Sequence, residues 1–119
     1  MLIVDANITF YFPDDNKNGC SHDLDAKAII RRDINLNGYL TAGQIYPEKE
    51  VSILNRGQTY KVMIQMPFVF GEVYEKVKDI LKPGGAFTIQ AASRILGEGH
   101  ILSFDYENDE ERWKDDKRE

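Results

Sequence analysis

Apolar and polar residues alternate along several short stretches of the chain, which is the pattern of a half-buried β-strand. The first such stretch is Met1–Phe12, and Pro13 ends it. Ile8, Phe10 and Phe12 share one face of this stretch, so we expect them to point into a core.

Five further stretches bounded by Gly, Pro or Asn-Gly show strand character. Their expected ranges are Ala26–Ile34, Gly38–Tyr46, Gln58–Met66, Ala86–Ala92 and Ile95–Phe104. Asn37-Gly38 predicts a hairpin turn, because both residues tolerate a positive φ. In the third of these strands, the two expected faces are Val62, Ile64 and Met66 on one side and Tyr60, Met63 and Gln65 on the other.

One segment has the period of a helix instead. Val73, Val77 and Leu81 recur every four residues, with polar residues on the opposite face. Pro83-Gly84-Gly85 should end this short helix. Gly97 and Gly99 lie inside a strand and indicate a bulge or a sharp bend there.

These elements predict an all-β domain over residues 1–104, namely a closed six-stranded antiparallel, Greek-key-like barrel or a sandwich, with one short inserted helix. We expect the barrel's own side chains to fill its interior and to leave no cleft for chemistry. Residues 105–119 form a charged tail, expected to be a frayed helix or disordered. Trp113 is the only large apolar side chain in the tail, and it either folds back on the barrel or anchors another protein.

The composition indicates a globular protein in a reducing compartment. The chain has 119 residues, 42% of them hydrophobic, which suits one domain. The apolar run at the N-terminus lacks basic residues and is broken by Asp5, so we expect neither a signal peptide nor a membrane segment. Cys20 is the single cysteine and cannot form an intrachain disulfide, which favours the cytoplasm.

The net charge of −5 is unevenly distributed. Residues 105–119 contain eight acids and four bases, or −4, so the remaining body carries −1 (−5 minus −4). Without a broad positive field, binding of a nucleic-acid backbone is disfavoured. The small basic clusters at Arg31-Arg32 and at Lys76, Lys78 and Lys82 are interpreted as solvated surface.

The stretch DDNKNGCSHDLD resembles a calcium-binding loop. Asp14, Asn16, Asn18 and Asp25 fall at ligand positions, and Gly19 falls at the sharp turn. However, a strand precedes this stretch where a calcium loop has a helix, and its last acid is shorter than the usual glutamate. We therefore expect a polar loop and keep calcium binding as an alternative.

No catalytic set of residues stands out. Cys20 and His22 could form a metal pair or a thiolate–imidazole couple, but His100 is the only other histidine and lies in a presumed strand. There is no phosphate-binding G-x-x-x-x-G-K-[ST] loop. The sequence therefore predicts no enzyme activity, no bound nucleotide, no cofactor and no favoured metal.

The segment Gly84 to Leu102 resembles the last hairpin of the C-terminal barrel of elongation factor Tu. The residues that match the family pattern are Phe87, Ile89, Arg94, Leu96, Gly97 and Gly99. Gln90 replaces a family arginine, and Ala92-Ser93 replaces two glycines.

Two more segments match the same family in the correct order, so that the resemblance extends over about Leu2 to Leu102. The first of them is RDINLNGYL, with Arg32, Leu36 and Gly38 in step. The second is the turn at Asn55–Gln58 and the strand that follows it. The extra residues Phe70–Pro83 coincide with the expected helix.

The resemblance implies a closed six-stranded antiparallel barrel. It does not imply GTP hydrolysis, which that family performs in a separate nucleotide-binding domain. In the family, this hairpin lies near the surface that meets the T stem of aminoacyl-tRNA, and the barrel also packs on the nucleotide domain and on the exchange factor. Arg94 could therefore contact a phosphate, or it could pair with a nearby carboxylate such as Glu98 or Glu72.

The leading hypothesis from the sequence is a non-catalytic protein-interaction module, one form of which is an immunity or inhibitor protein. The candidate partner-binding residues are Arg32, Arg94, Phe68, Phe70, Tyr74 and Trp113. The alternatives are a small hydrolase or metal-dependent enzyme that uses Asp14–Asp25, a tRNA-binding barrel that uses Arg31, Arg32 and Arg94, and a calcium-binding loop protein.

Overall fold

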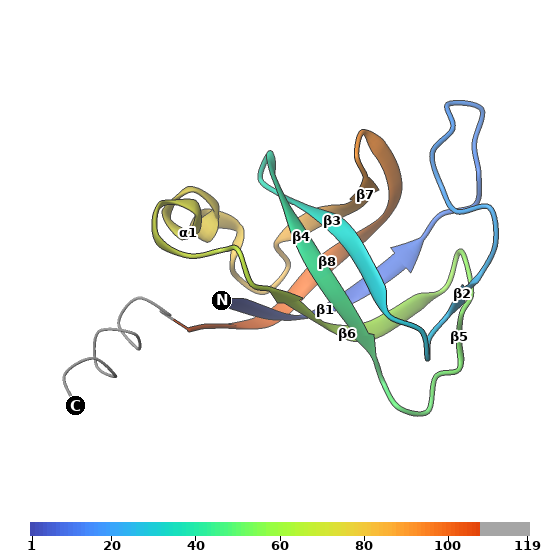
Figure 1. Ribbon diagram of the computed structural model, residues 1–119, viewed down its shortest axis with the longest axis horizontal. Helices are drawn as coiled ribbons and strands as arrows, with labels where there is room; N and C mark the ends of the chain where they lie inside the picture. Colours follow the sequence, from blue (N-terminus) through green and yellow to red (C-terminus); the bar gives the residue numbers. More distant parts are fainter. Residues whose placement is uncertain (108–119) are drawn as a thin grey trace.

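Six antiparallel strands close into a barrel in the computed structural model, which describes residues 1–107 (Figure 1). The neighbours around the barrel are β1-β6-β4-β3-β7-β8, so the chain order is interrupted in the Greek-key manner. The barrel strands are β1 Leu2–Phe10, β3 Ile30–Leu36, β4 Tyr39–Pro47, β6 Thr59–Met66, β7 Ala86–Ala91 and β8 Arg94–Tyr106. The expected closed barrel is confirmed; the expectations for Trp113 and for residues 108–119 lie outside the described part.

Three smaller elements are attached to the barrel. A two-stranded sheet joins β2 (Leu24–Asp25) to β5 (Ile53–Leu54). The inserted helix α1 spans Gly71–Val77 and continues as a 3-10 turn, η1, over Lys78–Ile80. Figure 1 shows α1 at the opposite end of the long axis from β2 and β5.

Strand β1 forms the centre of the core because it pairs with a neighbour along nearly its whole length on both sides. It meets β6 from Leu2 to Thr9 and β8 from Leu2 to Phe10. Its alternate side chains are no more than 1% exposed; these are Leu2, Val4, Ala6, Ile8 and Phe10. The barrel interior is thus filled by the chain's own side chains, as expected.

Three features of the strands differ from the prediction made from the sequence. Phe12 lies beyond the end of β1 and is 60% exposed, so it does not share the inward face of Phe10. Tyr60 pairs directly with Ile8 and therefore shares the face of Val62. The expected strand at Ala26–Ile34 begins only at Ile30, after a turn in which the Ala28 N–H donates to the Asp25 carbonyl.

The turns follow the local sequence closely. Asn37 and Gly38 have φ values of 53° and 88°, the paired positive angles of a tight hairpin turn between β3 and β4. The Asn35 side chain accepts the Gly38 N–H at 2.8 Å, which fixes the start of that turn. Strand β8 extends to Tyr106, two residues beyond the expected domain boundary.

The two glycines of β8 are required by close packing, and the bulge lies between them and the turn. A Cβ on Gly97 would lie 2.3 Å from the Thr9 carbonyl oxygen, and one on Gly99 would lie 2.2 Å from the Phe87 ring. The pairing steps from Ile89–Gly97 to Gln90–Ile95, which leaves Leu96 as the extra, bulged residue.

The helix covers one end of the barrel through its apolar face. Val77 and Leu81 are buried in the core, as the four-residue period predicts. The Tyr74 ring stacks on Tyr106 with 3.8 Å between ring centroids, and the Tyr106 hydroxyl accepts the Gly71 N–H. Among residues 1–107, no helix combines the length and the apolar character needed to cross a membrane.

The barrel closes weakly at one place, between β3 and β7. Those strands pair only at Asp33–Asn35 with Thr88–Gln90, although β4 pairs with β3 along all of Ile30–Leu36. Residues Ile30–Arg32 therefore have no strand on their β7 side. We call this gap, between Ile30–Arg32 and the β7–β8 turn, the seam.

We predict that Gly97→Ala lowers the free energy of unfolding by about 3 kcal/mol or more, because the new methyl group meets a fixed backbone carbonyl. Gly38→Ala is the control: it has the strain of a positive φ but no atom within 4 Å of the new methyl group, and should cost about 1 kcal/mol. Urea unfolding of both variants measures the difference. Equal losses would contradict the close approach of β8 to β1.

Candidate arginine-lined binding site

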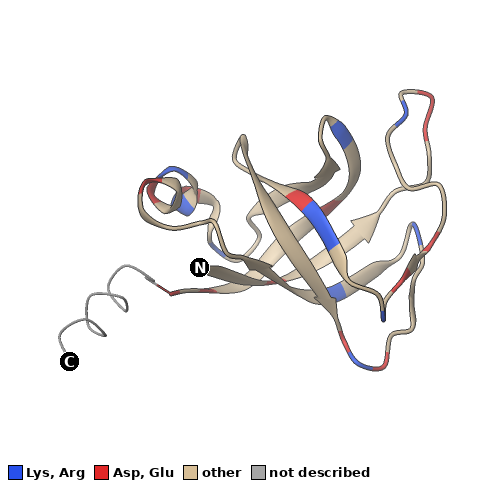
Figure 2. Ribbon diagram, viewed as in Figure 1, with Lys and Arg blue, Asp and Glu red and all other residues tan. Residues whose placement is uncertain are grey.

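A pocket of about 480 Å³ lies beside the seam. Arg31 and Arg32 reach it from β3, and Arg94 reaches it from the start of β8. Figure 2 shows basic residues on β3 and at the tip of the β7–β8 hairpin. We call this the arginine pocket; its lining also includes Cys20, His22, Asp33, Ala42 and Gln90. The expectation that the barrel offers no cleft is therefore wrong on its outside.

The three guanidinium groups of the arginine pocket have no acidic partner. Within residues 1–107, no carboxylate forms an ion pair with Arg31, Arg32 or Arg94. The one acid in the lining, Asp33, instead accepts the N–H of Ala92 at 3.1 Å. The pocket thus concentrates positive charge in a body that is nearly neutral.

The expected pairing of Arg94 with Glu98 or Glu72 is wrong. Glu98 lies beside Tyr11, where burial, followed by the charge of the Glu98 carboxylate, raises the pKa of the Tyr11 hydroxyl. Burial raises the pKa of the Cys20 thiol, and the positive charges of Arg32 and Arg94 oppose part of that rise. Arg32 and Arg94 are far apart in the sequence, and both line the arginine pocket.

A local turn and one glutamine set the position of Arg94. Ala92, at φ 53°, reverses the chain between β7 and β8, and Arg94 follows opposite Ala91. Gln90, only 9% exposed, donates its Nε2 to the Ala92 carbonyl at 2.8 Å. Its Oε1 accepts from the side chains of Asn35 and Thr88 at 3.0 and 2.8 Å. Gln90 therefore holds the hairpin, a role that sequence reasoning missed.

The long loop between β1 and β2 forms another wall of the pocket and is fastened to the hairpin. Asn18 accepts the Ile95 N–H through its side chain at 3.0 Å, and the Gly19 N–H donates to the Ile95 carbonyl at 2.8 Å. The Cys20 N–H donates to the Tyr11 carbonyl at 2.9 Å. Gly19 is required here, since a Cβ would lie 2.2 Å from the Phe12 carbonyl oxygen.

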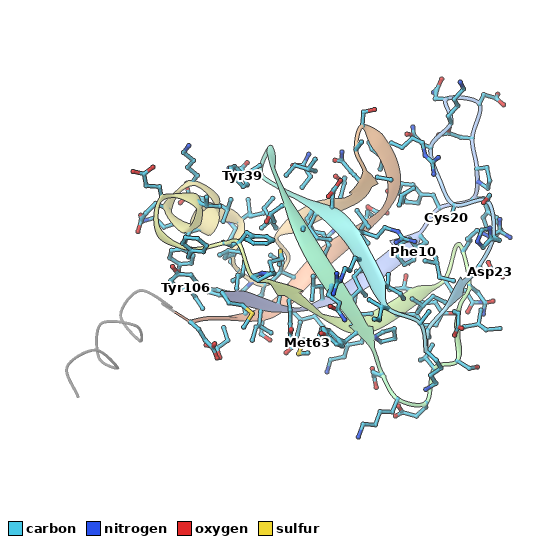
Figure 3. All side chains as sticks on the ribbon, viewed as in Figure 1. Phe10, Cys20, Asp23, Tyr39, Met63 and Tyr106 are labelled. Atoms are coloured by element: carbon cyan, nitrogen blue, oxygen red, sulfur yellow. The ribbon has the colours of Figure 1, made fainter. Side chains whose placement is uncertain are left out.

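Arg56 clamps the far end of this loop to the turn before β6. Its backbone N–H and its Nε both donate to the same carboxylate oxygen of Asp23, at 3.0 and 2.8 Å. Its Nη1 donates to the Cys20 carbonyl at 3.2 Å, and its guanidinium lies 5.0 Å from the centre of the Phe12 ring. Figure 3 shows Cys20 and Asp23 at the same end of the molecule. The clamp joins residues 33 positions apart, so no local signal in the sequence could have shown it.

The candidate calcium ligands use their oxygens within the loop. One oxygen of Asp14 accepts the N–H groups of Asn16 and Asn18, at 2.8 and 3.0 Å. Asp25 lies in β2, where it accepts the Lys27 N–H at 2.9 Å. No group of three or more His, Cys, Asp and Glu residues within 1–107 is arranged to hold a metal ion. The loop geometry is therefore explained without a metal.

The residues considered for nucleophilic or metal chemistry do not form a couple. The Cys20 thiol lies 3.9 Å from the Leu96 carbonyl oxygen, and burial raises its pKa, which keeps it neutral near pH 7. His22 shares a hydrogen bond with the Ser21 hydroxyl through Nδ1 at 2.9 Å. His100 is exposed on β8, opposite Ala86.

The apolar partner candidates divide into two groups. Phe68 is 63% exposed and lines a second depression of about 320 Å³, which shares Arg31 and Ala42 with the arginine pocket. Phe70 is 43% exposed and lies outside both depressions. Tyr74 is half-buried against Tyr106 and supports the helix. Arg32 and Arg94 therefore line one depression and Phe68 lines the next, and Arg31 belongs to both.

In comparisons with known proteins, no protein-family model and no curated protein matches the chain.

We predict that about 1 mM calcium leaves the melting temperature unchanged, because the loop is expected to bind no calcium. A ligand that did bind the folded state would raise the melting temperature. Thermal melts with calcium and with the same concentration of magnesium test this. A rise specific to calcium that disappears in Asp14→Ala would contradict the account of the loop.

We predict that the clamp between Asp23 and Arg56 opens only in acid. The Arg56 backbone N–H and then its guanidinium lower the pKa of Asp23 below its usual 3.8. A lowered folded-state pKa means that the clamp is stable above the unfolded-state pKa of about 3.9 and is lost as the pH falls through the folded-state value. The titration of the Asp23 carboxyl carbon by NMR measures the midpoint.

Asp23→Asn should accelerate amide exchange at Ser21 and His22 at neutral pH, whereas Asp15→Asn, an exposed change in the same loop, should not. A titration midpoint above 3.8, or equal exchange in both variants, would show that the clamp does not fix the loop.

Proposed function

We propose that the chain is a non-catalytic protein-interaction module that binds an acidic segment of its partner at the arginine pocket. The observation that carries this proposal is the convergence of Arg31, Arg32 and Arg94 on one pocket, none of them paired with a carboxylate within residues 1–107. Like charges held together repel one another, and a carboxylate between them relieves that repulsion while forming charge-assisted hydrogen bonds. Planar guanidinium groups suit carboxylates especially well.

Phe68 supplies an apolar contact next to this charge. It is exposed, and it lines the depression that continues from Arg31. Protein interfaces are rich in arginine and aromatic residues, and their binding energy depends on a few such side chains. The combination suits a protein partner that carries both carboxylates and an apolar group, as in an inhibitor or immunity protein acting in the cytoplasm.

The resemblance to the C-terminal barrel of elongation factor Tu supports a binding role. The three matched segments include Arg32 and Arg94, and both of these residues line the arginine pocket. That family's barrel contributes contacts to other macromolecules and leaves hydrolysis to a separate domain.

RNA is the second candidate, because the same three arginines could bind phosphates. Grouping them in one pocket favours it more than the sequence alone did. The nearly neutral body still lacks the extended basic stripe that tracks a nucleic-acid backbone.

We predict that a six-residue peptide made of glutamate and valine, with two of its glutamates consecutive, binds the arginine pocket. Arg32→Gln combined with Arg94→Gln should weaken binding about 100-fold, since each lost arginine contact accounts for about 1.4 kcal/mol. Lys61→Gln combined with Lys82→Gln removes the same charge from exposed positions outside the pocket and should change the affinity little. Fluorescence anisotropy of the labelled peptide measures both.

Filter retention of tRNA at two salt concentrations distinguishes the two candidates. Salt-sensitive retention that the two arginine substitutions abolish, without peptide binding, would favour RNA and overturn the protein proposal. Equal effects of the arginine and lysine substitutions would show that only net charge matters, and the pocket would lose its assignment.

A further inference from the structure

The seam leaves part of β3 without a backbone partner. Within residues 1–107, the ladder to β7 covers only Asp33–Asn35, and no backbone hydrogen bond to a loop or turn involves Ile30, Arg31 or Arg32. Successive residues of a strand direct their N–H and C=O groups to opposite sides, so β4 can satisfy only alternate residues of this stretch. The remaining groups face the seam.

The hydrogen bond of Arg32 shows how one of these groups is satisfied without a neighbouring strand. Its Nη1 donates to the Arg31 carbonyl at 2.7 Å, so a guanidinium occupies a position that a neighbouring strand would normally fill. Unpaired backbone groups at a strand edge are a ready template for another strand. An arginine that covers such a carbonyl can leave when a backbone N–H replaces it.

The short β7 explains why the seam exists. It ends at Ala91, and the turn at Ala92 reverses the chain before it can reach Arg32. The Asp33 carboxylate, which accepts the Ala92 N–H, terminates the ladder at this point. A strand laid along Ile30–Arg32 would extend roughly 10 Å, at about 3.3 Å per residue, and would lie beside the arginine pocket.

The positive charge of the arginines favours acidic side chains on such a strand. Arg31 and Arg32 are successive residues of β3, so their side chains leave opposite faces of the strand, and both line the arginine pocket at its edge. Opposite charges on neighbouring strands attract when their residues face one another. An added strand with two consecutive acids would therefore meet Arg31 with one carboxylate, and Arg32 and Arg94 with the other.

We propose that the acidic segment of the partner binds as an added β-strand on the free edge of β3 at Ile30–Arg32, with consecutive carboxylates on the three arginines. This inference rests on the proposed function above and specifies its geometry. In this mode the backbone hydrogen bonds supply affinity and the arginines supply specificity.

The test compares the glutamate–valine peptide with two N-methylated forms, one methylated at the odd residues and one at the even residues. Only alternate N–H groups of an added strand face β3, so methylation in one register should weaken binding at least tenfold, and methylation in the other should have little effect. The NMR signal of the Arg32 side chain should shift when the unmodified peptide binds, because its bond to the Arg31 carbonyl is replaced.

The peptide measurements test strand addition and the proposed function separately. If both methylated peptides bind as well as the unmodified one, or lose affinity equally, strand addition is wrong and the arginine pocket recognises side chains alone, so the proposed function stands without it. If the unmodified peptide does not bind, both strand addition and the proposed function are wrong.

Discussion

The short ladder between β3 and β7 is the constraint on which the binding surface depends. Every other junction of the barrel pairs over at least four residue positions, whereas this one is limited to Asp33–Asn35 with Thr88–Gln90. The core tolerates the gap because β1 carries the buried side chains between two long ladders. The gap in turn exposes the arginines of β3 to the hairpin that holds Arg94.

Local sequence patterns predicted most of the barrel because its strands and turns are determined locally. The hairpin at Asn37-Gly38 needs positive φ values that these residues tolerate, and the helix follows its four-residue period. The predicted start of β3 was wrong because Ile29 has strand character yet is 71% exposed, between a turn and the first residue of the strand. Phe12 was misplaced because the strand pattern continues past the point where the ladder to β8 ends.

The site was only partly predictable. Arg32 and Arg94 were identified through a family resemblance, whereas their convergence depends on barrel closure, which no local pattern encodes. The Asp23–Arg56 clamp and the Gln90 network join residues distant in the sequence. Cys20, considered for reactivity, instead packs in the wall of the pocket with a raised pKa. The tertiary contacts therefore decide which charged residues are left unpaired.

Amide hydrogen exchange in the free protein tests the open seam most directly. One of the two successive amides of Arg31 and Arg32 pairs with β4, and the other faces the seam, so we predict one slow and one fast site. The amides of β1, which is paired on both sides, should all be slow between Val4 and Ile8. If Arg31 and Arg32 both exchange as slowly as β1, the edge of β3 is already occupied, and the account of the arginine pocket as a strand-binding site is contradicted.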